Sequence, residues 1–140
     1  MVRFDDTNWK WFNEEIGFPE RSIYALEKKM GGKFWVGFKQ GGLSIFTGNS
    51  LKRFTKQNSL LPSNSVYTLA TEKNGILWIG TFGSGIVRFN EENWEYFNSK
   101  NSGLKDNFIF DIEVDIYNNK WIAAYQKGLF VYNERGVVIN

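Results

Sequence analysis

Hydrophobic residues along this chain form short stretches that are separated by turn-forming residues. In the central part of the sequence these stretches are residues 51–54, 65–71, 76–81 and 86–89. The turns that follow the last three are Lys73-Asn74-Gly75, Gly83-Ser84-Gly85 and Glu91-Glu92-Asn93. Glycine and asparagine there suit tight hairpins whose backbone needs a positive φ. The pattern therefore predicts antiparallel β-strands rather than helices.

The pattern repeats along the chain. Trp35, Trp78 and Trp121 recur at an interval of 43 residues. Other columns keep the same interval, namely Leu26/Leu69/Ile112, Gly42/Gly85/Gly128 and Phe46/Phe89/Tyr132. Four short strands in a repeat of about 43 residues are typical of a propeller blade. The sequence thus predicts an all-β fold, a β-propeller of four-stranded antiparallel blades, with the tryptophan columns packed between blades.

The chain, residues 1–140, is predicted to be one propeller segment with three complete blades. We expect these blades at residues 22–54, 65–97 and 108–140. Residues 1–12 realign with the outer part of the second blade and are predicted to be the two outer strands of a further, partial blade. Closed rings typically need four to eight blades. We therefore expect the ring to be completed by a second copy of the chain, as a homo-oligomer, or by further repeats of a longer protein.

Composition narrows the classes of function. The chain is 42% hydrophobic and 18% aromatic, which excludes intrinsic disorder. Its 17 basic and 15 acidic residues are interspersed, so nucleic acid is not an expected partner. Cysteine and histidine are both absent, which excludes disulfides, thiolate nucleophiles and the commonest general base and metal ligand. No cofactor, metal, export signal or membrane span is expected in the chain as given.

Residues 61–89, LPSNSVYTLATEKNGILWIGTFGSGIVRF, resemble the two-component regulator propeller repeat. The first and third repeats match less closely, since Ala123 replaces a glycine and Asn118 stands in the turn. Proteins of this family carry such repeats in extracytoplasmic propellers ahead of a membrane helix and a histidine kinase. The resemblance implies a periplasmic or extracytoplasmic, non-catalytic sensor module whose ligand is an oligosaccharide. The compartment cannot be inferred from the chain itself.

A ligand is expected at one rim of the propeller. If the strands of a blade are lettered A to D from the channel outward, the B–C turns and the D–A loops lie at the same end. The candidate binding residues there are Arg21, Lys39, Gln40, Asn64, Phe82, Ser84, Asn107, Asp111, Tyr125 and Gln126. Aromatic rings can stack on a sugar face while amides and hydroxyls bond its hydroxyl groups.

Alternatives remain open for these residues. Gln40, Asn64 and Ser84 are also ordinary turn residues, and Phe82 and Tyr125 are predicted either to contact a ligand or to pack on the adjacent blade. Asp111 stands in a column with Ala25 and Thr68, and either binds a ligand or cation or pairs with Lys105 or water.

The alternative function is a structural or protein-interaction propeller without a small-molecule ligand. A lyase-type enzyme finds no support, because no histidine, cysteine or Gly-x-Ser-x-Gly motif is present and no catalytic residue is predicted.

Overall fold

A computed structural model describes residues 2–4, 7–12, 15, 17–20, 22–133 and 136–139. Blade one consists of β3 (Ile23–Lys29), β4 (Lys33–Phe38), β5 (Leu43–Phe46) and β6 (Leu51–Phe54). Blade two consists of β7 (Val66–Thr71), β8 (Leu77–Thr81), β9 (Ile86–Phe89) and β10 (Trp94–Phe97). Blade three consists of β11 (Ile109–Val114), β12 (Lys120–Ala124), β13 (Gly128–Asn133) and β14 (Gly136–Ile139). Ahead of them, β1 (Val2–Phe4) and β2 (Trp9–Trp11) form a two-stranded hairpin.

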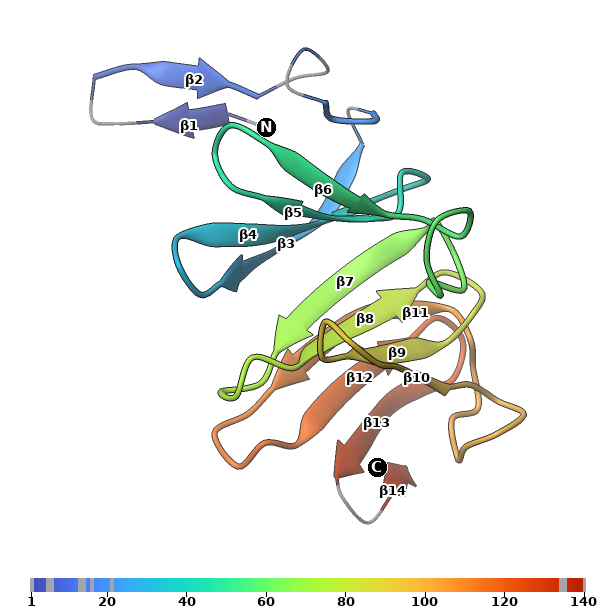
Figure 1. Cartoon of the computed structure of the whole chain (residues 1–140). Coiled ribbons are helices and arrows are strands. Elements are labelled where there is room, and N and C mark those ends of the chain that lie inside the picture. The colour runs from blue at the N-terminus through green and yellow to red at the C-terminus, as the bar shows by residue number, and fades with distance from the viewer. Residues whose placement is uncertain are drawn as a thin grey trace.

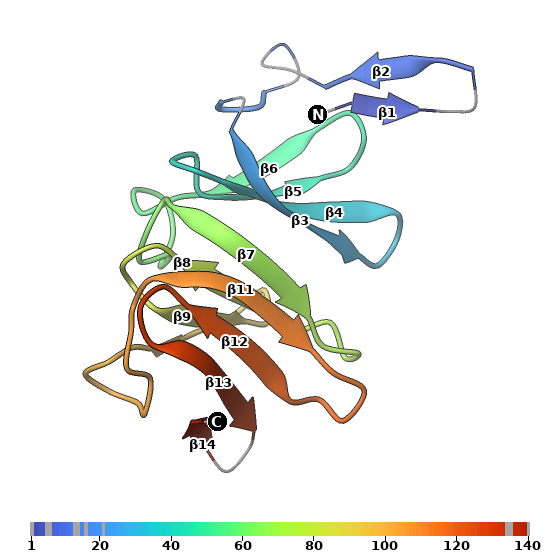
Figure 2. The same ribbon diagram turned by 180° about the vertical axis from the view of Figure 1, so that it is seen from behind.

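Each blade is an antiparallel sheet whose strands follow one another in chain order. Figures 1 and 2 show the three blades stacked as an open arc, with the β1–β2 hairpin beyond blade one at the other end from β14. The predicted fold class is confirmed: the described chain is all-β and forms a partial propeller of about three four-stranded blades.

The innermost strand of every blade contains a β-bulge at the same place. Ile23 pairs with Phe38 and Ala25 with Gly37, which leaves Tyr24 as the extra residue of β3. The same shift leaves Tyr67 as the extra residue of β7 and Phe110 as that of β11. A bulge bends the strand and redirects its side chain. Tyr24, Tyr67 and Phe110 therefore do not follow the regular alternation of side-chain directions along their strands, and they occupy equivalent positions in the three blades.

The hydrophobic core lies between blades. Trp35 of blade one is buried in a cluster with Leu69 and Ile79 of blade two. Trp78 of blade two is buried with Ile112 and other residues of blade three. Trp121 does not follow this prediction, because 37% of its surface is exposed compared with 1% for Trp35 and Trp78. The physical reason is that, in the part of the chain that the structure describes, no further blade lies against the face of blade three on which Trp121 stands.

Two glycines permit the close approach of neighbouring blades. A Cβ atom on Gly37 would lie 2.6 Å from Cγ1 of Val66, and one on Gly80 would lie 2.3 Å from Cγ2 of Thr68 in its own blade and 2.7 Å from Cγ2 of Ile109. Val66 and Ile109 each begin the innermost strand of the next blade. Ala123 occupies the same position in blade three, where no such strand is present. The glycine-to-alanine change that marks the third repeat thus falls on the open face.

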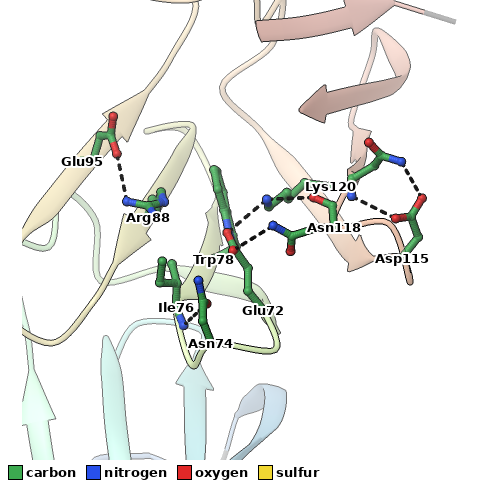
Figure 3. Close-up of polar contacts among 10 residues, drawn as sticks. Glu72, Asn74, Ile76, Trp78, Arg88, Glu95, Asp115, Asn118 and Lys120 are labelled. Carbon is green, nitrogen blue, oxygen red and sulfur yellow. Dashed lines mark hydrogen bonds and ion pairs between the residues drawn. The ribbon is translucent and has the colours of Figure 1, made fainter. Parts of the chain in front are cut away.

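The inner strands of successive blades are also joined by polar contacts, and the one between blades two and three is buried (Figure 3). Nζ of Lys120 lies 3.0 Å from Oε1 of Glu72, and Nε1 of Trp78 donates a hydrogen bond of 2.6 Å to the same oxygen. Nδ2 of Asn118 donates to Oε2 at 3.1 Å. Burial raises the pKa of Glu72, but these hydrogen bonds and the Lys120 charge outweigh it and leave the pKa below its ordinary value.

The equivalents of Glu72 in the other two blades are Lys29 and Asp115. Lys29 forms an ion pair with Glu91 of blade two, and its Nζ lies 5.1 Å from the ring centre of Trp35. Asp115 accepts a hydrogen bond of 2.9 Å from Nε1 of Trp121 and others from Asn119 within its own turn. The Trp121 and Asn119 hydrogen bonds lower the pKa of Asp115 from 3.8 to about 2.

Residues that precede blade one in the chain cover the outer half of that blade. Phe12, which follows β2, packs edge-on against Phe46 with 5.0 Å between ring centres. Phe18 packs against Phe38 and Phe46 at 5.8 and 5.3 Å. These contacts close a third buried cluster. The inner strand β3 gains no such cover, and Leu26 on it remains 51% exposed.

Replacing Glu72 by alanine is expected to lower the free energy of unfolding by about 3 kcal/mol, because Lys120 would stay buried without its carboxylate partner. Urea unfolding followed by circular dichroism measures the change. The matched control is Glu92→Ala in an exposed turn of the same blade, with an expected change within about 0.5 kcal/mol. A Glu72→Ala value as small as the control would contradict the role of this ion pair.

Acidification is expected to weaken the hydrogen bond between Trp121 and Asp115 only when the pH approaches 2. The pKa of Asp115 is lower in the folded than in the unfolded chain, so its contribution to stability is complete above pH 3.8 and is lost as the pH falls towards 2. The indole N–H resonance of Trp121 should titrate with a midpoint near pH 2 and should not titrate in Asp115→Asn. A midpoint near 3.8 would show that the hydrogen bonds to the carboxylate are absent in solution.

Candidate functional site

The B–C turns and the D–A loops meet at one end of the blades. The backbone N–H of Gly42, at the end of a B–C turn, donates to the carbonyl of Asn64 in the following D–A loop at 2.9 Å. In the next repeat Gly85 donates to the carbonyl of Asn107 at the same distance. This rim, built from connections of neighbouring blades, is where the sequence places its candidate ligand-binding residues.

The asparagine side chains of the rim hold the loops that carry them. Oδ1 of Asn64 accepts a hydrogen bond of 2.8 Å from the N–H of Lys56, and Nδ2 donates to Oε1 of Gln57. Asn107 repeats the arrangement with Ser99, at 2.8 Å to its N–H and 3.0 Å to its Oγ. The side chains of both predicted residues are therefore hydrogen-bonded within their own loops.

Acidic residues that sequence reasoning did not single out fix the B–C turns. Oε1 of Glu20 accepts hydrogen bonds from the N–H groups of Gln40 and Gly41, at 2.6 and 2.9 Å. In blade three, Oδ2 of Asp106 accepts one from the N–H of Gln126 at 2.9 Å. The side chains of Gln40 and Gln126, like that of Lys39, stay exposed on the rim. Polar residues recur at the 43-residue interval at positions 20, 63 and 106, and this recurrence could have indicated that the D–A loops bind the B–C turns.

Six aromatic side chains form a continuous cluster near the inner strands at this rim. We call it the aromatic cluster, and its members are Tyr24, Tyr67, Phe82, Phe108, Phe110 and Tyr125. Tyr67 and Phe82 are stacked with 4.6 Å between ring centres, and Phe110 lies parallel to Tyr67 at 6.2 Å. Tyr125 meets the edge of Phe110 at 5.3 Å. Residues from all three blades contribute.

The cluster combines packing with exposure. Phe82 is partly buried against Phe108 of the following blade, at 4.7 Å, which supports the packing interpretation for that residue. Tyr125 and Phe110 remain 53% and 46% exposed. Of these six residues, the sequence pattern predicts only Phe82 and Tyr125 as site residues. The other members were missed because the bulges that bring Tyr67 and Phe110 together are not visible in the strand pattern.

Asp111 follows Phe110 in the innermost strand of blade three and is exposed. Its Oδ1 accepts a hydrogen bond of 3.0 Å from Oγ1 of Thr68 in blade two. The N–H of Ile112 points at the same two oxygen atoms, at 3.0 and 3.1 Å. Asp111 is thus bound to Thr68, a partner outside the alternatives of a ligand, a cation, Lys105 or water, and the contact joins two blades.

A groove of about 400 Å³ lies on the outer part of the rim. It runs between the two D–A loops and contains two of the predicted residues, Ser84 and Asn107. Its other lining residues are Leu60, Pro62, Gly83, Tyr96, Asn98 and Lys100. Among the candidates, Arg21 lies outside the described residues. The rim thus offers exposed aromatic faces near the inner strands and a mixed polar and apolar groove further out.

Within the described residues, carboxylates do not gather in groups of three that would suit a metal ion. The described chain also contains no helix of the length and hydrophobicity needed to cross a lipid bilayer.

Comparison with known proteins agrees with the sequence resemblance. Residues 60–83 match the family model described as two component regulator propeller. A search of curated proteins finds no match. Among solved structures, the chain is similar to the extracellular domain of a hybrid two-component system from B. thetaiotaomicron, with a TM-score of 0.73 and 18% identity over 96% of this chain. The predicted resemblance to this family is confirmed.

Other similar structures have different roles. Virginiamycin B lyase from Staphylococcus aureus matches with a TM-score of 0.72 and 18% identity over 95% of this chain. PorZ, a surface component of the type-IX secretion system of Porphyromonas gingivalis, matches with a TM-score of 0.67 and 17% identity over 96%. The chain spans 45% of the lyase and 21% of PorZ and of the sensor domain. At such identities these likenesses show the propeller fold alone.

Proposed function

We propose that this chain is a non-catalytic, extracytoplasmic sensor module whose rim binds an oligosaccharide. The observation that carries the proposal is the aromatic cluster, because Phe110 and Tyr125 present exposed ring surface beside turns rich in amides. A pyranose ring has one apolar face that suits stacking and peripheral hydroxyls that need hydrogen-bond partners. The family match at residues 60–83 and the likeness to extracellular sensor domains support the same assignment.

The residues of the rim have separate roles in this proposal. Tyr125 and Phe110 provide the stacking surface, and the exposed amides of Gln40 and Gln126 provide donors and acceptors for hydroxyl groups. The outer groove, with Ser84 and Lys100, receives further units of the chain of sugars. Asn64 and Asn107 keep the loops in place, since their side chains are bonded within those loops.

A binding role is favoured over a lyase role by the available side chains. The lyase structure similar to this chain is a catalytically inactive variant in which a histidine is replaced by alanine. Histidine is absent from this chain, so a side chain of that type cannot act in it. Carboxylates, lysines and tyrosines remain, and the rim carboxylates Glu20, Asp106 and Asp111 accept hydrogen bonds from backbone N–H groups or from Thr68.

Neutral and acidic oligosaccharides are expected to raise the melting temperature of the chain, because a ligand that binds only the folded state stabilises it. Tyr125→Ala and Phe110→Ala should each weaken binding roughly tenfold, as expected for loss of one stacking partner. Isothermal titration calorimetry measures the affinities. Tyr117→Ala is the matched control, since Tyr117 is an exposed tyrosine in the A–B turn at the opposite end of blade three.

Two results would contradict the sugar proposal. One is a panel in which no oligosaccharide changes the melting temperature while a pull-down recovers one defined protein, which would indicate a protein-interaction propeller. The other is binding that survives in Tyr125→Ala and Phe110→Ala, which would place the ligand elsewhere on the chain.

A further inference from the structure

The free face of blade three has the residues of an inter-blade junction without the neighbouring blade. Leu43 and Ile86 are buried at their junctions, whereas their equivalent Leu129 is 45% exposed. Trp121 differs from Trp35 and Trp78 in the same way. The two exposed side chains lie on the adjacent strands β12 and β13. This face therefore keeps the apolar contact surface that the other two blades bury.

The same face carries hydrogen-bond acceptors at junction positions. Oε1 of Glu27 in blade one accepts a hydrogen bond of 3.1 Å from the N–H of Thr71 in blade two. Oγ1 of Thr68 in blade two accepts one of 3.1 Å from the N–H of Ile112 in blade three. The equivalents of Glu27 and Thr68 in blade three are Glu113 and Asp111, and both are exposed. β11 therefore presents the Glu113 carboxylate where inner strands bind the backbone of the next blade, whereas Asp111 is bound to Thr68 of blade two.

The opposite end of the arc presents the complementary strand. Leu26 on β3 is 51% exposed, whereas its equivalents Leu69 and Ile112 are 7% and 1% exposed. The neighbouring Lys28 is the equivalent of Thr71 and is exposed. The N–H groups of Leu26 and Lys28 thus correspond to the two that are bound at the internal junctions. A lysine at this position also complements a face that carries Glu113 and Asp115.

We infer that the free face of blade three docks on the inner strands of blade one in a second copy of this chain. Glu113 then accepts the N–H of Lys28 and lies beside its ammonium group. The side chain of Leu26 packs on Trp121 and Leu129. This contact repeats the one that Glu27 makes with Thr71 and that Leu69 makes with Trp35 and Leu43 in the chain itself.

The junction between copies differs from an internal junction in two respects. The β1–β2 hairpin lies beyond the outer strands of blade one, so blade one itself meets the incoming blade through its inner strands alone (Figure 1). Trp9 and Trp11 of that hairpin are 68% and 73% exposed. In this docking the hairpin covers the outer strands of the incoming blade. Ala123 has the Cβ that Gly37 and Gly80 lack, so the two copies stand further apart there.

The docking is heterologous, because different surfaces of each copy meet, and such contacts close into a ring when the rotation permits. A curved arc of about three blades favours a ring of two copies. A blade face of four strands covers about 300 Å², so two junctions bury about 1,200 Å² in total. That area lies at the lower end of the range for specific, stable protein interfaces.

Light scattering coupled to size-exclusion chromatography tests this inference on the intact chain. We expect a mass of two copies for the wild type and of one copy for Glu113→Lys, which places a lysine against Lys28. Glu92→Lys, an exposed charge reversal on blade two, is the matched control and should remain dimeric. A wild type with the mass of one copy overturns the inference. A dimer that survives in Glu113→Lys also overturns it, since another surface would then hold the copies together.

Exchanging the charges of Lys28 and Glu113 distinguishes a variant that has lost the contact between copies from one that has failed to fold. Lys28→Glu should give one copy for the same reason as Glu113→Lys. The double variant K28E/E113K restores opposite charges at the junction and should recover the dimer. Each single variant should keep the circular dichroism spectrum of the wild type. A double variant that stays at one copy, while folded, would show that Lys28 and Glu113 do not meet.

Discussion

The structure depends on one constraint, which is that each four-stranded sheet has two apolar faces and must be covered on both. Blade two satisfies this condition, because Trp35 and Leu43 of blade one cover one face and Ile112 and other residues of blade three cover the other. Gly37 and Gly80 allow the covering strand to come within contact distance. Stability is therefore shared between neighbours and is not a property of any single blade.

Polar contacts refine this apolar packing. Each internal junction has an ion pair at the end of the inner strand, Lys29 with Glu91 or Glu72 with Lys120. The sign of the residue on the inner strand is reversed between the two junctions. Because a buried charge without its partner is costly, a blade placed in the wrong order would leave Glu72 or Lys120 unpaired. We interpret these contacts as a device that fixes the order of the blades.

The candidate site follows from the same architecture. The turns at one end of the blades donate backbone hydrogen bonds to the carboxylates of Glu20 and Asp106, which hold the rim in place beside the exposed aromatic cluster. A rigid rim lowers the entropic cost of ligand binding. Closing the ring would add the rim of a second copy beside Tyr125 and Phe110, so ligand binding and association of copies are expected to influence each other.

The sequence alone determined the strands, the 43-residue repeat, a partial propeller of about three four-stranded blades and the family resemblance, because hydrophobic period and turn residues are local properties. It also placed Phe82 and Tyr125 at the rim. Only the tertiary structure decided that bulges gather Tyr67 and Phe110 around them, that Asp111 bonds Thr68, and that Trp121 is exposed. These features depend on which strand of another blade lies opposite, and a periodic sequence assigns the same environment to every copy of a repeat, including the one whose neighbour is missing.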